Sequence, residues 1–422
     1  MTEATTPAGE MLAADGTPLK ASLRRALRAQ KTRALMLVAP LLIFVLVSFL
    51  LPIGDMLFRS VENDIVPNTL PKTVVALRDW DASGDELPGE PVYAALYDDL
   101  SVAVKEKTNT RLGQRLNYEN SGMSSLMRGV MRDLRKMDPS QPLKPQFIDG
   151  DAKWGDIGTW RTIETFSGKF TSGYILNAVD LQRVPDGIAV KPESQRVYVK
   201  LFLRTFVMSL AITLTCFVLG YPIAFLLANL PLRTSNLLMI LVLLPFWTSL
   251  LVRTASWKVL LQNQGVINDV LVWLGVIDNA HRLALINNAT GTIITMTHIL
   301  LPFMILPLFS VMKGIKPTYV RAAKSLGAND WTAFWRVYFP QSVPGVGAGA
   351  ILVFILAIGY YITPELVGGT TGVFISNRIA YHISTSLNWG LAAALATLLL
   401  IVVLALYWTY DRIVGIDNVK LG

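Results

Sequence analysis

Six long apolar runs constrain this chain more than any other feature of its sequence. A helix needs about 20 apolar residues to cross a hydrocarbon core about 30 Å thick. Runs of that length lie near residues 34–58, 201–229, 236–261, 290–312, 344–366 and 390–411. We therefore predict an all-α membrane protein with six spans.

Composition agrees with a membrane protein and argues against several other classes. Only 16% of the residues are charged, against about 25% in soluble domains. The formal net charge of +8 is explained by basic residues that flank the spans, because no basic stripe with interleaved aromatic residues indicates nucleic-acid binding. The single cysteine, Cys216, excludes an intrachain disulfide, and three scattered histidines lack the spacing of a metal site.

The distribution of basic residues predicts the topology. Arg233 follows the second run, a cluster from Lys313 to Arg336 follows the fourth, and Arg412 and Lys420 follow the sixth. Short loops rich in Lys and Arg stay in the cytoplasm. We therefore expect both termini in the cytoplasm.

The first apolar run has two interpretations, a cleaved signal peptide or a retained membrane helix at 34–58. The basic region before it is long, and no A-x-A-like cleavage site follows it. Both observations favour the retained helix, preceded by a cytoplasmic tail at 1–33. A second cytoplasmic tail is expected at 413–422.

Residues 59–200 interrupt the membrane pattern. Acidic and basic side chains are nearly balanced there, so the segment is not a span. It is long enough for a small domain, and its aromatic and apolar residues favour folding over a disordered loop. Helices are predicted near Val92–Lys107 and Leu126–Lys136. The predicted topology makes this segment a periplasmic insert domain between the first two spans.

The loop at 313–342 begins with a predicted short helix. Pro317 stands where a helix can start, the residues up to Leu326 have helical character, and Gly327 can end the helix with a positive φ. The pattern predicts one half of a cytoplasmic helix–turn–helix.

A second short helix is predicted after that turn. Asp330 can cap it, and Pro340 and Pro344 are expected to stop it before the next span. Four aromatic residues at helical spacing form one face of this helix: Trp331, Phe334, Trp335 and Tyr338. An aromatic face of this kind either docks on a partner protein or rests on lipid, and composition alone does not decide between the two.

The spacing in this loop resembles the EAA loop of binding-protein-dependent ABC importer permeases. Ala322 and Ala323 are followed after three residues by Gly327, and after nine more by Val-x-Phe-Pro, which ends at Pro340. The acidic residue that precedes the alanines in that family is Arg321 here, which removes any salt bridge of an acid at this point. The resemblance implies a coupling loop that docks in a groove of a separate ATPase subunit. The residues that match are Arg321, Ala322, Ala323, Gly327, Ala328, Trp331 and Pro340.

The resemblance covers about residues 200–412, and its finer match is to the spermidine/putrescine permease branch. It implies a six-helix transmembrane domain of the type I importer kind in a bacterial inner (plasma) membrane. It also implies a polyamine, or a related small organic solute, as cargo. The stretches that carry the finer match are Arg204-Thr-Phe, Gly220-Tyr-Pro-Ile-Ala, Leu244-Pro-Phe-Trp-Thr-Ser, Val252-Arg-Thr, Gln264-Gly-Val-Ile-Asn268 and Tyr361-Ile-Thr-Pro-Glu-Leu-Val-Gly-Gly369.

The same resemblance implies partners. A permease of this kind pairs with a second permease subunit, here expected to give a heterodimer, and works with a dimer of ATP-binding subunits and a periplasmic solute-binding protein. The glycine-rich stretch 368–372 lacks the Gly-Lys-Ser/Thr of a P-loop, and the sequence has no Walker A motif. We therefore expect a chain that is not an enzyme and holds no cofactor, with ATP bound by the partner, and we interpret 368–372 as a flexible outer loop.

Charged residues within spans are costly and are functional candidates by default. A diamine would be attracted by Glu365 and by the rings of Trp247, Tyr360 and Tyr361. Arg253 would repel it unless paired. The alternative for both charges is snorkelling or a partner at a helix end. These five residues form the candidate translocation path.

Two other functions compete with the importer. A membrane receptor with a periplasmic ligand-binding domain is expected to carry a cytoplasmic signalling domain, and none follows Gly422. An ion-coupled secondary transporter is expected to place carboxylates near the midplane, and the apolar runs have none near their centres. A docking loop without a nucleotide motif favours the importer.

Overall fold

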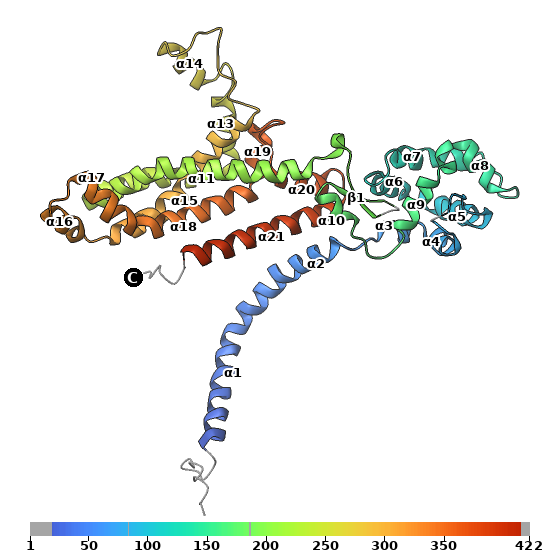
Figure 1. The fold of residues 1–422 in the computed structure, drawn as a ribbon, viewed down its shortest axis with the longest axis horizontal. Helices are drawn as coiled ribbons and strands as arrows, with labels where there is room; N and C mark the ends of the chain where they lie inside the picture. The colour runs from blue at the N-terminus through green and yellow to red at the C-terminus, as the bar shows by residue number, and fades with distance from the viewer. Residues whose placement is uncertain (1–18, 83, 185–186, 415–422) are drawn as a thin grey trace, which may run out of the picture. The chain divides into compact units, whose positions relative to one another are not determined.

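The computed structural model describes residues 19–82, 84–184 and 187–414, and contacts divide the chain into two compact units, Met1–Phe58 and Arg59–Gly422 (Figure 1). Most of the C-terminal tail and the first part of the N-terminal tail predicted above lie outside the described residues.

The described part of the first unit is one long, continuous run of helix. Its segments are α1 (Leu19–Val45), the π-helical η1 (Leu46–Leu50) and α2 (Leu51–Arg59). Residues Gln30–Arg59 are long and apolar enough to cross a membrane, and none of the most apolar stretch is buried. The prediction of a helix at 34–58 is confirmed.

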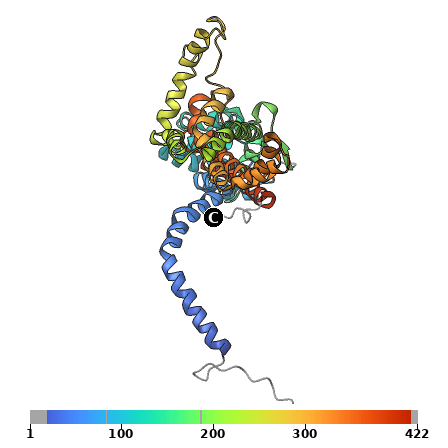
Figure 2. The ribbon, with the colours of Figure 1, turned by 90° about the vertical axis from the view of Figure 1, so that its left-hand side faces the viewer.

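Four long helices of the second unit are also long and apolar enough to be spans. Figure 1 shows α11, α15 and α18 running side by side, and Figure 2 shows the same group nearly end-on. Their close approach depends on glycine, since a Cβ at Gly349 would lie 2.8 Å from Met304 Sδ, and one at Gly345 would lie 3.0 Å from Val311. Cys216 is buried in this bundle as a small apolar side chain. The bounds are α11 Tyr198–Asn229, α15 Ala289–Gly314, α18 Phe339–Gly359 and α21 Trp389–Val414.

The run predicted at 236–261 is not one continuous helix. It consists of α12 (Leu232–Leu243) with the 3₁₀ turn η5 (Leu244–Trp247), and then α13 (Leu250–Leu260), bent by 95° at the break. Pro245 lacks an N–H, and the Ser249 hydroxyl accepts from Val252 N at 3.2 Å and so starts a new helix. The described residues therefore contain five candidate spans, or six if the bent pair counts as one.

The fifth predicted run, 344–366, is also shorter than expected. The helix α18 ends at Gly359, and Ile362–Val367 form a separate short helix, α19. A third piece, α20 (Ile375–Ser384), follows before α21. The α14 segment (Val266–Trp273) precedes α15.

Residues 59–200 fold into short helices around an aromatic core. Tyr93, Phe147, Trp154 and Trp160 are each at most 1% exposed, and their ring centroids lie 4.7–5.9 Å apart. The two helices predicted from sequence are present as α5 and α7. The helical segments are α3 Ile65–Thr69, α4 Pro71–Ala76, η2 Leu77–Asp79, α5 Glu90–Glu106, α6 Asn109–Asn117, α7 Met123–Leu134, α8 Leu143–Gly150, η3 Ala152–Gly155, α9 Ile157–Thr165, α10 Gly173–Ala178 and η4 Glu193–Gln195.

This insert also contains a β-hairpin that the all-α prediction missed. Strands β1 (Leu181–Val184) and β2 (Gly187–Val190) pair antiparallel, with Leu181 opposite Val190. Each strand has only four residues, which is too short for the alternation that reveals a strand in sequence.

Candidate functional site

The first half of the predicted helix–turn–helix has the expected geometry. Helix α16 (Pro317–Ser325) begins with Pro317 in its first turn, and Gly327 has a φ of 92°. The Ala328 N–H donates to the Ala323 carbonyl at 3.1 Å, which closes the turn on the second alanine of the motif. The two alanines thus lie in the last turns of a helix, and Gly327 forms the left-handed turn that ends it.

The second half differs from the prediction in its cap and in its end. Asn329, and not Asp330, caps α17 (Asp330–Ala333), because its Oδ1 accepts from Thr332 N at 2.8 Å. Asp330 pairs with Lys324 across the turn. Pro340 and Pro344 do not stop the helix, which runs through the π-helical η6 (Phe334–Tyr338) into α18.

The helix continues because each proline removes only one i→i−4 backbone hydrogen bond, and prolines are tolerated within membrane helices. Two side chains next to the prolines bond the backbone of the same helix. Gln341 Nε2 donates to the Val337 carbonyl at 2.8 Å, and Ser342 Oγ donates to the Phe339 carbonyl at 2.7 Å.

The aromatic face divides into a packed half and an exposed half. Tyr338 is 6% exposed, and its ring lies 5.1 Å from that of Phe225 on α11. Phe334 lies 5.8 Å from the same ring. Trp331 is 71% exposed, Trp335 is 45% exposed, and Leu326 at the turn is 89% exposed. The packed half, Phe334 and Tyr338, holds the loop against α11. The exposed half, formed by Leu326, Trp331 and Trp335, is an apolar surface that we call the loop tip.

The candidate path residues near α19 are held together by α20. Asn377 Nδ2 donates to Glu365 Oε2 at 2.6 Å and to the Tyr361 carbonyl at 2.9 Å, and Ser376 Oγ donates to the Tyr360 carbonyl at 2.5 Å. Sequence reasoning missed Ser376 and Asn377. The signal that could have found them was their place in the first turn of a helix, where Ser and Asn are favoured.

The other candidate path residues lie on the bent pair. A hydroxyl contact of 3.1 Å between Thr254 and Thr363 joins α13 to α19. Arg253, beside that contact, has buried Nε and Nη1 atoms without a hydrogen-bond partner among the described residues. Trp247 lies before the break and is 85% exposed, so the structure does not bring it together with the path candidates of α19.

The glycine-rich stretch 368–372 is packed tightly, in contrast to the flexible loop expected. Gly369 has a φ of 53°, and a Cβ there would lie 2.2 Å from the Asn287 carbonyl oxygen. A Cβ on Gly372 would lie 2.5 Å from Thr292 Oγ1. Arg204 Nη1 donates to the Thr370 carbonyl at 2.8 Å. The glycines allow close backbone approach to the start of α15.

Buried side chains of the insert contact the membrane helices. Asp180 Oδ1 accepts from Val197 N and Tyr198 N at 3.1 Å each, and its Oδ2 accepts from Val199 N at 2.8 Å, so that it caps α11 from the insert. The Tyr174 ring lies against Gly390 of α21, where a Cβ would lie 2.3 Å away.

A buried ion pair supports this junction from the insert side. Arg115 Nη1 donates to Glu119 Oε1 at 2.8 Å, and both side chains are at most 3% exposed. The guanidinium also lies over the rings of Phe166 and Tyr174, at 4.8 and 4.3 Å.

A buried histidine completes the contact between the insert and the membrane helices. His382 of α20 is 3% exposed, with Nε2 3.0 Å from the Tyr198 hydroxyl and Nδ1 2.8 Å from Ser386 Oγ and 3.5 Å from the Tyr118 hydroxyl. Burial, together with the charge of Arg378, lowers the pKa of His382 to about 4. The ring is therefore neutral near pH 7.

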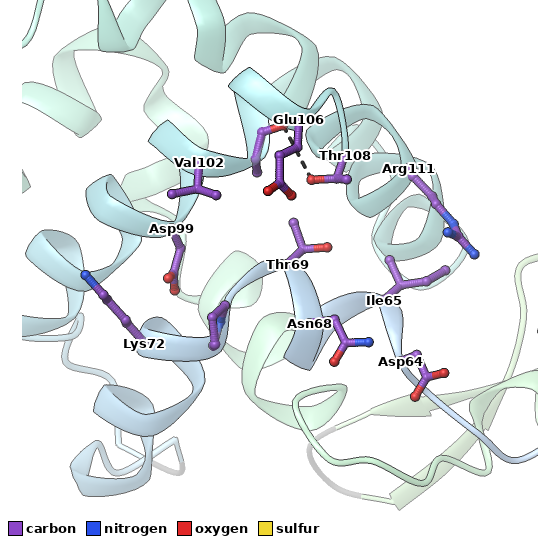
Figure 3. Close-up of a pocket in the computed structure, with 12 residues that line it drawn as sticks. Asp64, Ile65, Asn68, Thr69, Lys72, Asp99, Val102, Glu106, Thr108 and Arg111 are labelled. Carbon is purple, nitrogen blue, oxygen red and sulfur yellow. Dashed lines mark hydrogen bonds between the residues drawn. The ribbon is translucent and has the colours of Figure 1, made fainter.

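The insert carries a separate hollow of about 480 Å³ between α3–α4 and α5–α6 (Figure 3). Glu106 and Thr69 point into it from opposite sides. Asp99 is 4% exposed, and its Oδ2 accepts from both the backbone N and the hydroxyl of Thr73 at 2.7 Å. This carboxylate joins α4 to α5 and fixes one wall of the hollow.

Comparison with known proteins defines the class of this chain. The binding-protein-dependent transport system inner membrane component family matches residues 220–414. The chain belongs to that family. It is therefore a multi-pass inner-membrane permease subunit of an ABC importer, and such a subunit is not itself catalytic.

Individual relatives are similar over about half of the chain. The spermidine/putrescine transport system permease protein PotB of Escherichia coli (strain K12) is 37% identical over 222 residues, which cover 52% of this chain and 80% of PotB. The inner membrane ABC transporter permease protein YdcU of the same strain is 32% identical over 225 residues, covering 51% of this chain and 71% of YdcU. A chain in the crystal structure of a bacterial alginate ABC transporter is 18% identical, with a TM-score of 0.45, and the match covers 54% of this chain and 81% of that one.

Proposed function

We propose that this chain forms part of the translocation path of an importer for polyamines or a related small organic solute, and that it couples to a separate ATPase through the loop at 313–342. The observation that carries the coupling role is the exposed loop tip on a helix–turn–helix whose inner face is fixed to α11. An apolar tip outside the spans fits a groove on a partner protein. The proposed contacts are Arg321, Ala322, Ala323, Gly327, Ala328, Trp331 and Pro340.

The polyamine proposal rests on the relatives named above and on part of the candidate path. The Glu365 side chain is exposed and carries a carboxylate, and Tyr361 beside it is 47% exposed. A carboxylate and an aromatic face suit an ammonium group. Arg253 opposes this substrate class, so that we place the ammonium near Glu365 and away from α13.

The proposed assembly contains this chain, a second and different permease subunit, two ATP-binding subunits and a periplasmic solute-binding protein. Reconstitution of that assembly in vesicles tests the substrate. We expect spermidine or putrescine, with the binding protein, to stimulate ATP hydrolysis, and Glu365→Gln to reduce the stimulation severalfold. Stimulation by an unrelated solute alone would contradict the polyamine assignment and leave the coupling role standing.

The proposed organisation places both termini and the coupling loop in the cytoplasm and residues 59–200 in the periplasm. The domains are a tail at 1–33, a first span at 34–58, the insert at 59–200, five further helices at 201–412 and a tail at 413–422. Single cysteines introduced at positions 100, 370 and 329 of a Cys216→Ala chain test this organisation. An impermeant thiol reagent added outside should label the first two positions and not the third, and labelling at position 329 in intact cells would reverse the topology.

We further propose that the insert contributes to docking of the binding protein or to capping the outer mouth of the path. Its near-neutral charge favours short-range contact over long-range steering. The competing role is a stabilising appendage. A variant in which a Gly/Ser linker replaces residues 80–156 tests these roles. The measurement is the stimulation of ATP hydrolysis by the binding protein in the assembled complex. Unchanged stimulation at unchanged stability of the complex would rule out both docking and capping.

A further inference from the structure

A second cavity, of about 390 Å³, lies where the insert meets α11 and α20. Its wall combines polar side chains of the insert with side chains of both membrane-domain helices. No Asp or Glu contributes to the lining, unlike the hollow in Figure 3, which has three. The lining includes Tyr118, Lys191, Gln195, Tyr198, Arg378 and His382.

Positive charge in this cavity comes from Lys191 and Arg378, since the buried His382 ring is neutral near pH 7. Lys191 is 4% exposed, and its Nζ donates to Asn177 Oδ1 and, at 3.5 Å, to the Tyr118 carbonyl. Burial lowers the pKa of Lys191, because the ammonium has lost most of its water. An anion in the cavity would replace the lost water and favour the charged form of Lys191.

The acids nearest to Lys191 are Glu119 and Asp180, and both also bond other donors. Glu119 Oε1 accepts from Arg115 at 2.8 Å and from Asn177 at 2.7 Å, and its buried Oε2 has no hydrogen-bond partner among the described residues. Both oxygens of Asp180 accept backbone N–H groups at the start of α11. Arg378 is exposed and lies 5.6 Å over the Tyr381 ring, and no carboxylate among the described residues forms an ion pair with it. The positive charge of Arg378 is therefore left without an acidic partner in the cavity lining.

The cavity lies where candidate spans begin, which is the level expected for lipid headgroups. Tyr198 lines the cavity and is the first residue of one span, and Trp389 is the first residue of another. Trp389 is 47% exposed and Tyr381 is 42% exposed, as expected for aromatic residues at a membrane interface. Three apolar side chains of α11, Val199, Leu203 and Leu210, are each more than 50% exposed and form a stripe that begins one residue after Tyr198 of the cavity lining.

We propose that this cavity binds the phosphate headgroup of a membrane phospholipid. Arg378 and Lys191 supply the positive charge that a phosphate requires. The acyl chains lie along the exposed stripe of α11. Since the insert, α11 and α20 all contribute to the wall, the bound lipid ties the insert to the membrane helices.

The test uses the full chain purified in mild detergent, with bound phospholipid counted by native mass spectrometry. We expect one retained phospholipid per chain, and at least fivefold lower occupancy in Arg378→Gln. Arg378→Lys should keep most of the occupancy because it keeps the charge. Lys200→Gln is the matched control, since Lys200 is an exposed cation at the same depth outside the cavity lining, and it should retain the lipid.

Thermal stability after delipidation distinguishes the sources of the anion. Short-chain phosphatidylglycerol should raise the unfolding temperature of the wild type and of Lys200→Gln, and should raise that of Arg378→Gln much less. An equal rise with inorganic phosphate alone would overturn the lipid assignment. Equal lipid occupancy in Arg378→Gln and the wild type would overturn the proposal. Weaker binding of the solute-binding protein to Arg378→Gln at unchanged lipid occupancy would also overturn it, in favour of a carboxylate on that protein.

Discussion

The two ends of helix α11 are built in opposite ways. At the end that carries Tyr198, a buried carboxylate caps the helix, and an ion pair and a neutral histidine lie beside it. At the end that carries Asn229, the neighbouring loop leaves Trp331 and Leu326 exposed to 71% and 89%. At the first end, polar groups of this chain satisfy the start of the helix, whereas at the second end large apolar side chains remain exposed. The difference indicates that the insert is fixed to the membrane helices, and the exposed loop tip agrees with the proposal that this loop docks on a partner.

The largest effect is expected at the loop turn, where Gly327→Val should abolish uptake. Gly327 has a φ of 92°, and no atom lies within 4 Å of the place that a Cβ would occupy. A β-branched residue is therefore excluded by backbone strain and not by a clash. Uptake and binding-protein-stimulated ATP hydrolysis are the measurements. Gly327→Asn should retain activity because Asn tolerates this conformation.

The control for this prediction is Gly314→Val at the end of α15. Gly314 also has open space around it but has no positive φ. If Gly314→Val loses as much uptake as Gly327→Val, the left-handed turn is not the cause.

At the insert end, Arg115→Ala should reduce the stability of the protein by about 3–5 kcal/mol. The change leaves the Glu119 carboxylate buried without its partner and removes the guanidinium from two aromatic rings. The thermal unfolding midpoint measures the loss. Lys72→Ala is the matched control, because the Lys72–Asp98 pair has side chains 62% and 54% exposed, and exposed ion pairs contribute little to stability. Equal losses of stability in Arg115→Ala and Lys72→Ala would mean that the buried Arg115–Glu119 pair does not stabilise this end of the protein.

The third prediction concerns pH at the same end. The pKa of His382 is about 4 in the folded chain, below about 6.5 for a free histidine, so the unfolded chain binds the proton more readily. Stability should therefore be complete above about pH 6.5 and should fall as the pH drops toward 4, by up to about 3 kcal/mol. Unfolding midpoints across this range should show the slope in the wild type and a smaller slope in His382→Gln.

The exposed His281 is the control for the pH prediction. Its side chain is 83% exposed, and His281→Gln should leave the slope unchanged. A wild-type slope that persists in His382→Gln would assign the pH dependence to another group.

The smallest effect is expected from Asp180→Ala, which removes the cap of α11. Loss of a helix N-cap costs about 0.5–2 kcal/mol. Asp180 also has a φ of 58°, a conformation that Asn accepts. Asp180→Asn should therefore lose less stability than Asp180→Ala in the same unfolding assay. An identical loss in the two variants would show that the carboxylate charge, and not the shape of the cap, holds the insert to α11.

Local patterns predicted the parts of the molecule that depend on neighbours in sequence. Pro317 and Gly327 mark the two ends of α16 because an imino ring and a missing Cβ act on their own residue. The same local reasoning was wrong at Pro340 and Pro344, because each proline removes one backbone hydrogen bond and the helix continues past it. It also missed the sharp bend between Trp247 and Leu250, because a hydropathy window does not distinguish a bent pair of helices from a straight span.

The apolar runs, the basic loops and the spacing of Ala322, Ala323 and Gly327 were sufficient to reach the membrane class and the importer family, because each is a property of one continuous stretch. The junction at the outer end of α11 was not accessible in that way. Tyr118, Tyr198 and His382 meet across 264 residues of chain, and Asp180 caps a helix that begins 18 residues later. Only the packed structure brings such groups together, since the free energy that holds a buried polar side chain comes from partners that the sequence places elsewhere.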